Sequence, residues 1–292
     1  MKYVKLIAGS LVLYFLILSG SSPLGSCTKH SIEHDTTIVH IHDTTITHVH
    51  DTTIKIDTVY DITTGLVAYY NFNGGNLHDS SGNGNDIVLN NGATLTADRF
   101  GRSNNAFQFN GSTTYMQVHN SPTLNPADGI TLMAIIRVGA FNTATNCNAN
   151  DVIQKGEPDP VNGLYLLRFE PPTVCSAPSI DSAHEYFTAS YGDDVPQGNA
   201  AGLIDTSVIH AGTWYSVVFT YDGITSKLYL NGKLKTTSQK SASFTANSQD
   251  LFIGISNFGP FPYAFNGAID EIRIYNRALS QSAINQLGQL TQ

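Results

Sequence analysis

Three pairs of acidic residues in this 292-residue chain are candidates to act together, and one of them, Asp181 and Glu185, lies beside a loop rich in Pro and Ser. Hydrolysis of a glycosidic bond needs two carboxyl groups that face one cleft, and along a strand this requires alternate positions. Asp270 and Glu271 are adjacent, so an extended strand would point them to opposite faces. Glu157 and Asp159 alternate, but each is followed by a proline that places the pair in a turn. Because Gly-x-Ser-x-Gly and His-Glu-x-x-His are also absent from the sequence, catalysis is not favoured.

A segment rich in aromatic residues and proline, 257–265, has the chemistry of a sugar-binding loop. An aromatic ring offers a flat apolar face on which the apolar face of a pyranose can stack. The two prolines of the segment would stiffen the loop and lower the ordering cost of binding. We expect Phe258, Phe261 and Tyr263 to contact the ligand. The alternative is that this loop folds back over the core of the domain.

Residues 1–26 have the features of an export signal. Two lysines precede an apolar run of 13 residues, 6–18, which is shorter than the ~20 residues that span a bilayer. The signal ends in Leu24-Gly25-Ser26-Cys27, which resembles the bacterial lipoprotein signal. The resemblance implies that Cys27 is lipidated and that acyl chains anchor the protein to the outer membrane, facing the cell exterior. The alternative is an ordinary secretory signal with an incidental cysteine.

Residues 27–64 are predicted to comprise the lipidated Cys27 and, after it, an extended spacer. The phrase His-Asp-Thr-Thr-Ile recurs every eight residues, at 34–38, 42–46 and 50–54. Eight is even, so an extended chain shows the same face at each repeat, and the Thr and Ile content disfavours a helix. The 37 residues after Cys27 could reach roughly 120 Å. The alternative is that paired histidines of the repeat bind a metal.

Residues 65–292 predict one all-β domain in which short β-type segments alternate with Gly and Asn turns. Asp222-Gly223 and Asn231-Gly232 are tight-turn signals. We expect a sandwich or barrel. Alternation places Trp214 in a strand and predicts it in the core. The expected strands are 130–138, 163–169, 185–191, 213–221, 227–230, 251–256 and 267–275, with one helix at 280–287 capped by Ser280.

The segment Leu66–Phe72, followed by Asp79–Asn85, resembles the opening of laminin-G-like domains of the concanavalin A-like lectin/glucanase superfamily. Residues 106–111 and 214–232 match that family in type and order, and 265–280 matches its closing signature. The resemblance implies a jelly-roll sandwich of two curved antiparallel sheets over 65–292. Glucanases of the superfamily carry the motif Glu-x-Asp-x-x-Glu, which is absent from this sequence.

A calcium site is predicted near Asp79. The run Asp79-x-Ser81-x-Asn83 spaces oxygen side chains like the start of an EF-hand, but Asn90 stands where that loop needs Glu. Related laminin-G-like modules hold Ca²⁺ between this turn and the closing Asp. The resemblance therefore implies a structural Ca²⁺ bound by Asp79, Asn83 and Asp270. The alternative is that Asp79 caps its own turn.

Two cysteines remain once Cys27 is lipidated, in a protein exported to an oxidising environment. The segments 151–155 and 163–169 predict a hairpin, so the loops that carry Cys147 and Cys175 leave from its same end. We expect a disulfide between them, which would contribute about 3–4 kcal/mol of stability in the chain-entropy model.

The net charge of the chain excludes some classes of binding partner. It has 15 basic and 23 acidic residues, a formal net charge of −8, and no basic cluster. Nucleic-acid binding and direct binding to anionic membranes are therefore excluded, and the lipid anchor is the one expected membrane contact. The sequence predicts a surface-anchored, non-catalytic module that binds an extracellular glycan. The alternatives are a protein-binding or structural surface component (an adhesin) and a glycoside hydrolase.

Overall fold

The computed structural model describes the β domain, the segment before it and four short N-terminal strands: residues 2–8, 11–17, 37–41, 44–48, 57–140, 149–156, 163–170, 186–193, 201–256 and 263–290. At the N-terminus, β1 (Lys2–Ala8) and β2 (Leu11–Ile17) form an antiparallel hairpin. None of the helices in these ranges has the length and apolar content of a membrane span.

The octad repeats form paired strands. β3 (Thr37–Ile41), β4 (Thr44–His48) and β5 (Asp57–Tyr60) make a three-stranded sheet in that order. Thr, Ile and Val favour strands, and the even repeat gives successive copies the same alternation. The first two copies of the repeat therefore contribute neighbouring strands; the third copy, 50–54, lies outside the described residues, and the extended spacer stays a prediction.

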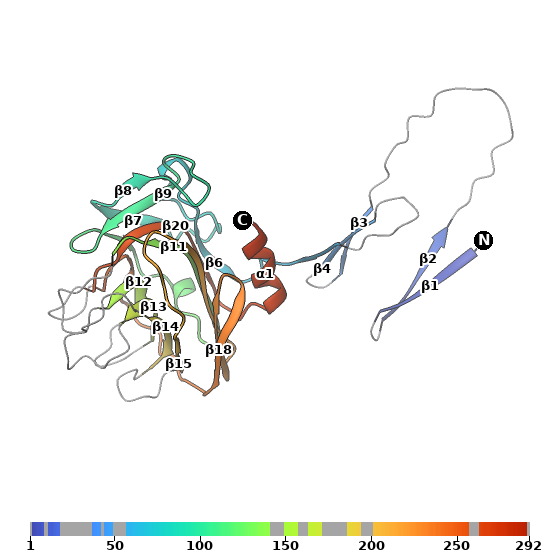
Figure 1. Cartoon of the computed structure of the whole chain (residues 1–292). Helices are drawn as coiled ribbons and strands as arrows, with labels where there is room; N and C mark the ends of the chain where they lie inside the picture. Colours follow the sequence, from blue (N-terminus) through green and yellow to red (C-terminus); the bar gives the residue numbers. More distant parts are fainter. Residues whose placement is uncertain are drawn as a thin grey trace, which may run out of the picture. The chain divides into compact units, whose positions relative to one another are not determined.

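The β domain is a sandwich of two antiparallel sheets, as predicted (Figure 1). The seven-stranded sheet has the order β15-β14-β13-β12-β19-β10-β7, and the eight-stranded sheet has the order β18-β17-β16-β11-β20-β9-β8, with β6 also paired to β20. The strands are β6 (Leu66–Tyr70), β7 (Ile87–Asn91), β8 (Thr94–Thr96), β9 (Ala106–Asn110), β10 (Tyr115–Val118), β11 (Ile130–Val138), β12 (Asn150–Lys155), β13 (Leu164–Glu170), β14 (Tyr186–Gly192), β15 (Ala201–Asp205), β16 (Trp214–Tyr221), β17 (Thr225–Leu230), β18 (Lys233–Gln239), β19 (Leu251–Ile253) and β20 (Asn266–Tyr275). Two short 3₁₀ helices, η1 (Asn73–Gly75) and η2 (Pro122–Leu124), and α1 (Gln281–Leu290) complete the described elements.

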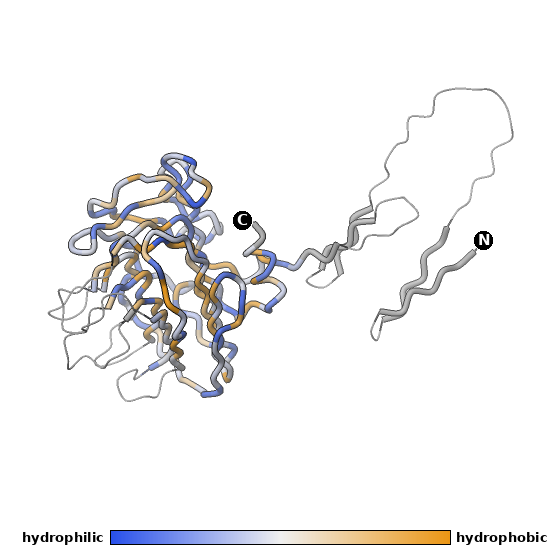
Figure 2. Tube along the Cα trace, viewed as in Figure 1, coloured by the Kyte–Doolittle hydropathy of each residue, from blue (hydrophilic) through white to orange (hydrophobic). Residues whose placement is uncertain are grey.

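The main core lies between the two sheets and is built from alternate residues of the strands. In β13, for example, Tyr165, Leu167 and Phe169 face inward and are fully buried. Figure 2 shows the resulting pattern, with hydrophobic positions along the strands and hydrophilic ones concentrated at the turns. The ring of Tyr191 stacks on Phe244 with the centroids 4.9 Å apart. Period-two alternation therefore positions the core, as the sequence indicated.

A second hydrophobic cluster lies on the outer face of the eight-stranded sheet, beneath α1. Met133 and Val218 of the sheet pack here against the helix residues Ala283, Ile284 and Leu287. The N–H of Ala283 donates to Ser280 Oγ at 3.2 Å, which confirms the predicted N-cap.

The prediction for Trp214 is wrong in one respect. This side chain is half-buried and packs against the outer cluster, not between the sheets. Tyr215, the next residue of β16, faces the inner core instead. Because side chains alternate along a strand, only one of the two neighbours can face inward.

The chain is tied to the sandwich from Tyr60 onward. The N–H of Tyr60 donates to Gln286 Oε1 of α1 at 2.6 Å. The Arg277 guanidinium donates to the backbone oxygens of Asp61 and Thr64 at 3.0 and 2.8 Å. These long-range contacts hold the segment before Gly65 against the outer side of the eight-stranded sheet.

A fully buried lysine lies at one end of the sandwich. Lys155 Nζ donates to Asn247 Oδ1 at 2.8 Å and to Asn125 Oδ1 at 3.3 Å. Burial lowers the pKa of Lys155 from 10.5 to about 8, and the charge of Asp250 opposes this shift. The two amides come from separate loops, so the ammonium group connects these loops to β12.

Candidate functional site

A β-bulge brings Asp270 and Glu271 together. Ile135 pairs with Glu271 and Ile136 with Ile269, so Asp270 is the extra residue of β20. Arg99 Nη1 contacts Asp270 Oδ2 at 2.7 Å and its Nη2 contacts Glu271 Oε2 at 3.3 Å. The expectation that the two carboxylates point to opposite faces is therefore wrong, because a bulge re-aims side chains that strict alternation would separate.

These two acids belong to a buried ion network. The Asp270 and Glu271 side chains are 4% and 7% exposed, and Glu271 also accepts a hydrogen bond from Arg273 Nε. Burial raises the pKa of Asp270, while the hydrogen bonds and charge of Arg99 oppose the rise. A glycosidase needs one carboxylate free to reach the sugar and a second one across the scissile bond. Carboxylates enclosed by guanidinium groups do not have that arrangement.

The predicted calcium ligand Asp79 is bound by its own turn. Its Oδ1 accepts hydrogen bonds from the N–H groups of Tyr69 and Ser81, both at 2.9 Å. Its Oδ2 accepts from Ser81 Oγ at 2.7 Å and from the N–H of Asn85 at 3.1 Å. Asn83 lies in the same turn, and its Nδ2 donates to a backbone oxygen of β6 at 2.9 Å. Tyr69, Ser81 and Asn85 therefore direct hydrogen-bond donors at the Asp79 carboxylate, whereas Asn83 donates to β6 instead.

This donor set does not fit a calcium ion. Ca²⁺ takes six to eight oxygen ligands, whereas Asp79 is surrounded by N–H and O–H donors and Asp270 by the Arg99 cation. Within the described ranges, no three His, Cys, Asp or Glu side chains converge as a metal site would require. The contacts favour the capping alternative for Asp79, and Ca²⁺ binding stays a prediction.

Several predicted site residues lie outside the described residues: Phe258, Phe261, Cys27, Cys147 and Cys175. The aromatic contacts of the first two, the lipidation and the disulfide therefore stay predictions.

Tyr263 is the described member of the predicted aromatic site, and it lies beside a buried ion pair. Its ring is half-buried, and the Arg168 guanidinium carbon is 5.4 Å from the ring centroid. Arg168 Nε is 2.8 Å from Oδ1 of Asp151, a carboxylate with no solvent exposure. The N–H of Asp151 donates to the Tyr263 backbone oxygen at 3.0 Å. Asp151, at the start of β12, thus holds the Tyr263 backbone directly, and it holds the Tyr263 ring through Arg168 of β13.

The outer face of the seven-stranded sheet continues from Tyr263 with rings and polar groups. Tyr115 and Phe252 form a tilted pair with the centroids 6.0 Å apart. Gln154 pairs with Phe252, and Thr188 pairs with Arg168. Among the described residues, the buried atoms Gln154 Oε1 and Thr188 Oγ1 have no hydrogen-bond partner. Aromatic rings and polar side chains therefore lie side by side on this face, and the two unpartnered oxygen atoms are buried beneath its surface.

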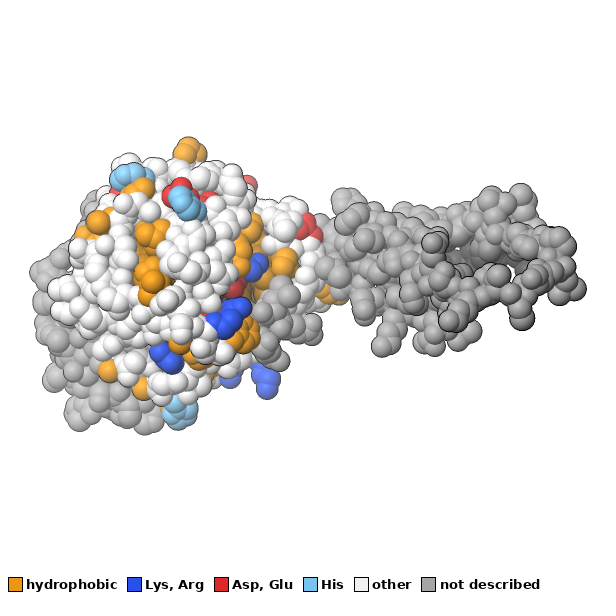
Figure 3. All heavy atoms as spheres, turned by 90° about the horizontal axis from the view of Figure 1, so that it is seen from above, with side chains coloured by type: hydrophobic (Ala, Val, Ile, Leu, Met, Phe, Trp, Pro, Cys, Tyr) orange, Lys and Arg blue, Asp and Glu red, His pale blue; other side chains and the backbone are white. Residues whose placement is uncertain are grey.

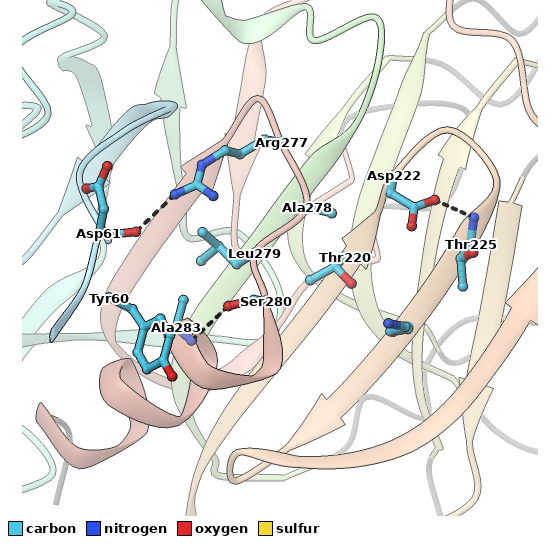
Figure 4. Close-up of a pocket in the computed structure, with 11 residues that line it drawn as sticks. Tyr60, Asp61, Thr220, Asp222, Thr225, Arg277, Ala278, Leu279, Ser280 and Ala283 are labelled. Carbon is cyan, nitrogen blue, oxygen red and sulfur yellow. Dashed lines mark hydrogen bonds between the residues drawn. The ribbon is translucent and has the colours of Figure 1, made fainter. Parts of the chain in front are cut away.

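A hollow of about 340 Å³ lies at the N-terminal end of α1 (Figure 4). Asp61 and Asp222 line it, but each carboxylate accepts hydrogen bonds from the backbone N–H groups of its own turn. Hydrogen bonds from Thr64 and Thr63 hold the pKa of Asp61 well below its usual range. Because its acids are satisfied locally, we assign no ligand to this hollow.

A comparison with known protein families shows to which family the chain belongs. A family model described as "Concanavalin A-like lectin/glucanases superfamily", of the laminin G type, matches residues 110–285. The chain belongs to this superfamily. The family resemblance is thereby confirmed; the match includes the closing motif, 265–280, whereas the opening motif, 66–85, lies before it. A search of curated proteins found no significant match.

Solved structures with the same superfamily fold include carbohydrate-related domains. Domain 4 of AbnA, a GH43 extracellular arabinanase from Geobacillus stearothermophilus solved with arabinotriose, aligns with TM-score 0.57 and 21% identity over 77% of this chain and 98% of that domain. A structure of botulinum neurotoxin type C, whose cell entry depends on interaction with two ganglioside molecules, aligns with TM-score 0.59 and 15% identity over 79% of this chain. The chain spans about half, 52%, of that toxin chain. At these identities the likeness shows the fold.

Sequence reasoning missed the arginines of this superfamily member. Arg99 neutralises Asp270 from a distant part of the chain, and Arg168 neutralises Asp151 on the neighbouring strand. Their small number could have pointed to them. The sequence contains only six arginines, and buried acids need a cationic partner.

Proposed function

We propose that this domain binds extracellular carbohydrate without cleaving it, through the outer face of the seven-stranded sheet around Tyr263. The observation that carries the proposal is the half-buried Tyr263 ring, which is fixed by the Arg168–Asp151 pair. An ordered ring loses little entropy when a sugar stacks on it. Phe258 and Phe261 lie outside the described residues and stay predicted ligand contacts.

Two further observations support a binding module over a hydrolase. Asp270 and Glu271, the acids that the fold brings together, are buried against arginines. The arabinanase domain of the same fold was solved with arabinotriose, and the neurotoxin of the same fold interacts with gangliosides. An oligosaccharide is therefore the ligand class to test first.

Tyr263→Ala is expected to weaken glycan binding by on the order of tenfold, about 1–2 kcal/mol, because the stacking surface is lost. The melting temperature should change little, since the ring is half-buried and lies outside the main core. Arabinotriose, ganglioside oligosaccharides and a wider glycan array are suitable probes, with affinity measured by calorimetry on residues 57–292.

The matched control is Val88→Ala, which trims a 51% exposed side chain on β7, away from the Tyr263 ring. Its affinity should equal that of the parent domain. If Tyr263→Ala instead unfolds the domain while the folded fraction binds normally, the loop belongs to the core. If the folded parent binds no glycan, the protein-binding or structural alternative takes its place.

The export signal suggests where this binding takes place. We propose that acylated Cys27 holds the protein at the outer membrane, facing outward, with the repeats between anchor and domain. Cys27→Ser should move the protein from the membrane fraction to the soluble fraction, because a thioether-linked lipid cannot form on Ser. Immunoblots of fractionated cells measure this, and unchanged membrane retention would contradict the anchor.

A further inference from the structure

A second hollow, of about 370 Å³, lies on the outer face of the eight-stranded sheet. We call it the Trp214 hollow. Its lining includes Arg99, Phe100, Trp214, Ser216, Asn231 and Gly288, which come from the loop after β8, from β16, from the β17–β18 turn and from α1. Its volume lies in the range of small-molecule sites. It is separate from Tyr263, which lies on the other sheet.

Two aromatic rings border the Trp214 hollow, and each is paired with arginine. The Arg137 guanidinium lies 5.1 Å from the centroid of Trp214, the single tryptophan of the chain. Arg99 and Arg102 lie 4.6 and 4.9 Å from the centroid of Phe100, whose side chain is 44% exposed. A guanidinium over a ring is attracted to the negative face of that ring and keeps its own orientation fixed.

The arginines differ in whether an acid neutralises them. Arg99 pairs with Asp270 and Glu271, and Arg102 pairs with Asp98. In the part of the chain that the structure describes, Arg137 has no acidic partner, and its described side-chain contact is the Trp214 ring. Arg137 is not one of the lining residues, but it pairs with Trp214 across β11 and β16 and brings a positive charge next to this lining ring, in a chain with a net charge of −8.

Polar groups complete the hollow beside Trp214. Ser216 is two residues along β16 from Trp214, so both side chains project from the same face. The backbone of Asn231 is fixed because its N–H donates to the Ser216 oxygen at 2.8 Å and its Oδ1 accepts from the Ser216 N–H at 2.9 Å. Its side-chain NH₂ group is left to donate to a ligand. Figure 3 shows one face of the molecule, on which uncharged side chains predominate and basic side chains lie beside hydrophobic ones.

We propose that the Trp214 hollow binds an acidic sugar, a pyranose that carries a carboxylate. The ring stacks on Trp214 or Phe100, the carboxylate pairs with Arg137, and hydroxyls bond to Ser216 and Asn231. Arginine suits this role because its planar fork matches the two oxygens of a carboxylate. This inference rests on the proposed carbohydrate-binding function, but it assigns a second site with its own residues and its own ligand charge.

Gly288 allows the hollow to be filled without touching its aromatic or charged residues. It lies one helical turn after Ile284, on the side of α1 that faces the sheet, and a Cβ built there meets no atom within 4 Å. Gly288→Phe should therefore occupy the hollow while the domain stays folded. The matched control, Asn285→Phe, adds the same ring at an exposed position of the same helix.

The probes are trigalacturonate and its uncharged counterpart, galactotriose, measured by calorimetry at 50 and 300 mM salt. We expect the parent domain to prefer the acidic probe, and Gly288→Phe to weaken its binding at least tenfold. Asn285→Phe should bind it as the parent does. Arg137→Gln should remove most of the preference for the acidic probe and its salt dependence.

The outcomes separate the two proposals. Two results would overturn the Trp214 hollow alone. One is trigalacturonate binding that persists in both Gly288→Phe and Arg137→Gln. The other is the absence of trigalacturonate binding in a protein that still binds a glycan through Tyr263. The absence of binding to every glycan, acidic or neutral, overturns both proposals. Circular dichroism and the melting temperature confirm that each variant is folded before its affinity is interpreted.

Discussion

Arg99→Met is expected to lower the free energy of unfolding by about 3–5 kcal/mol at pH 7. The substitution keeps the apolar stem but removes the guanidinium that bridges Asp270 and Glu271, whose side chains are 4% and 7% exposed. Glu271 keeps Arg273 as a partner, whereas Asp270 retains only the backbone N–H of residue 99. A buried carboxylate without its cation is among the most destabilising changes a core can undergo. Urea denaturation measures the loss.

The loss should shrink as the pH falls. Burial already raises the pKa of Asp270 in the folded state, and removal of Arg99 would raise it further. A folded-state pKa above the unfolded value means that the native state takes up the proton first. The unfolding free energy of the variant therefore recovers between pH 7 and about pH 4.

Arg102→Met is the matched control for this prediction. Arg102 also lies on the Phe100 ring, but its side chain is 57% exposed, and Asp98 has backbone N–H donors besides this partner. The loss should cost less than that of Arg99, because Asp98, although its side chain is fully buried, keeps the backbone N–H groups of residues 100 and 102 as donors. Equal costs for the two variants would show that the Arg99 network is not what stabilises the bulge.

Lys155→Met is expected to stabilise the domain by about 1–3 kcal/mol at pH 7. Burial lowers the pKa of Lys155 from 10.5 to about 8, so holding the charged form inside the fold costs up to about 3 kcal/mol. Methionine keeps the stem and fills a similar volume. Asn125 Oδ1 and Asn247 Oδ1 lose the lysine as a donor. The first still accepts a hydrogen bond from the N–H of Asn247, and the second still accepts one from the N–H of Gln249.

The pH dependence identifies the cause of this effect. Because the folded-state pKa lies below the unfolded value, the native state releases its proton first as the pH rises. The parent should therefore gain stability between about pH 8 and pH 10.5, and Lys155→Met should lack that gain. Lys233→Met, at an exposed position of β18, should retain it. A parent with no gain in this interval would show that Lys155 titrates as an exposed lysine does.

Local patterns in the sequence predicted eight of the fifteen strands described in the β domain, and they predicted helix α1. Alternation along 130–138 and 214–221 predicted β11 and β16, and Asp222-Gly223 and Asn231-Gly232 predicted the turns that follow. Ser280 predicted the start of α1 through its side chain. Each of these features depends on residues within a few positions of one another, where propensity and hydrogen bonding act directly.

The tertiary structure alone decided how the chemically important residues meet. The bulge that joins Asp270 to Glu271 arises from the pairing of β20 with β11, and alternation within β20 does not show it. Trp214 faces outward because α1 and its neighbours supply a second cluster on that side of the sheet. Arg99 meets Asp270 across 171 positions of sequence. Such contacts depend on sheet order and register, which result from the packing of the whole domain, so no local spacing of residues records them.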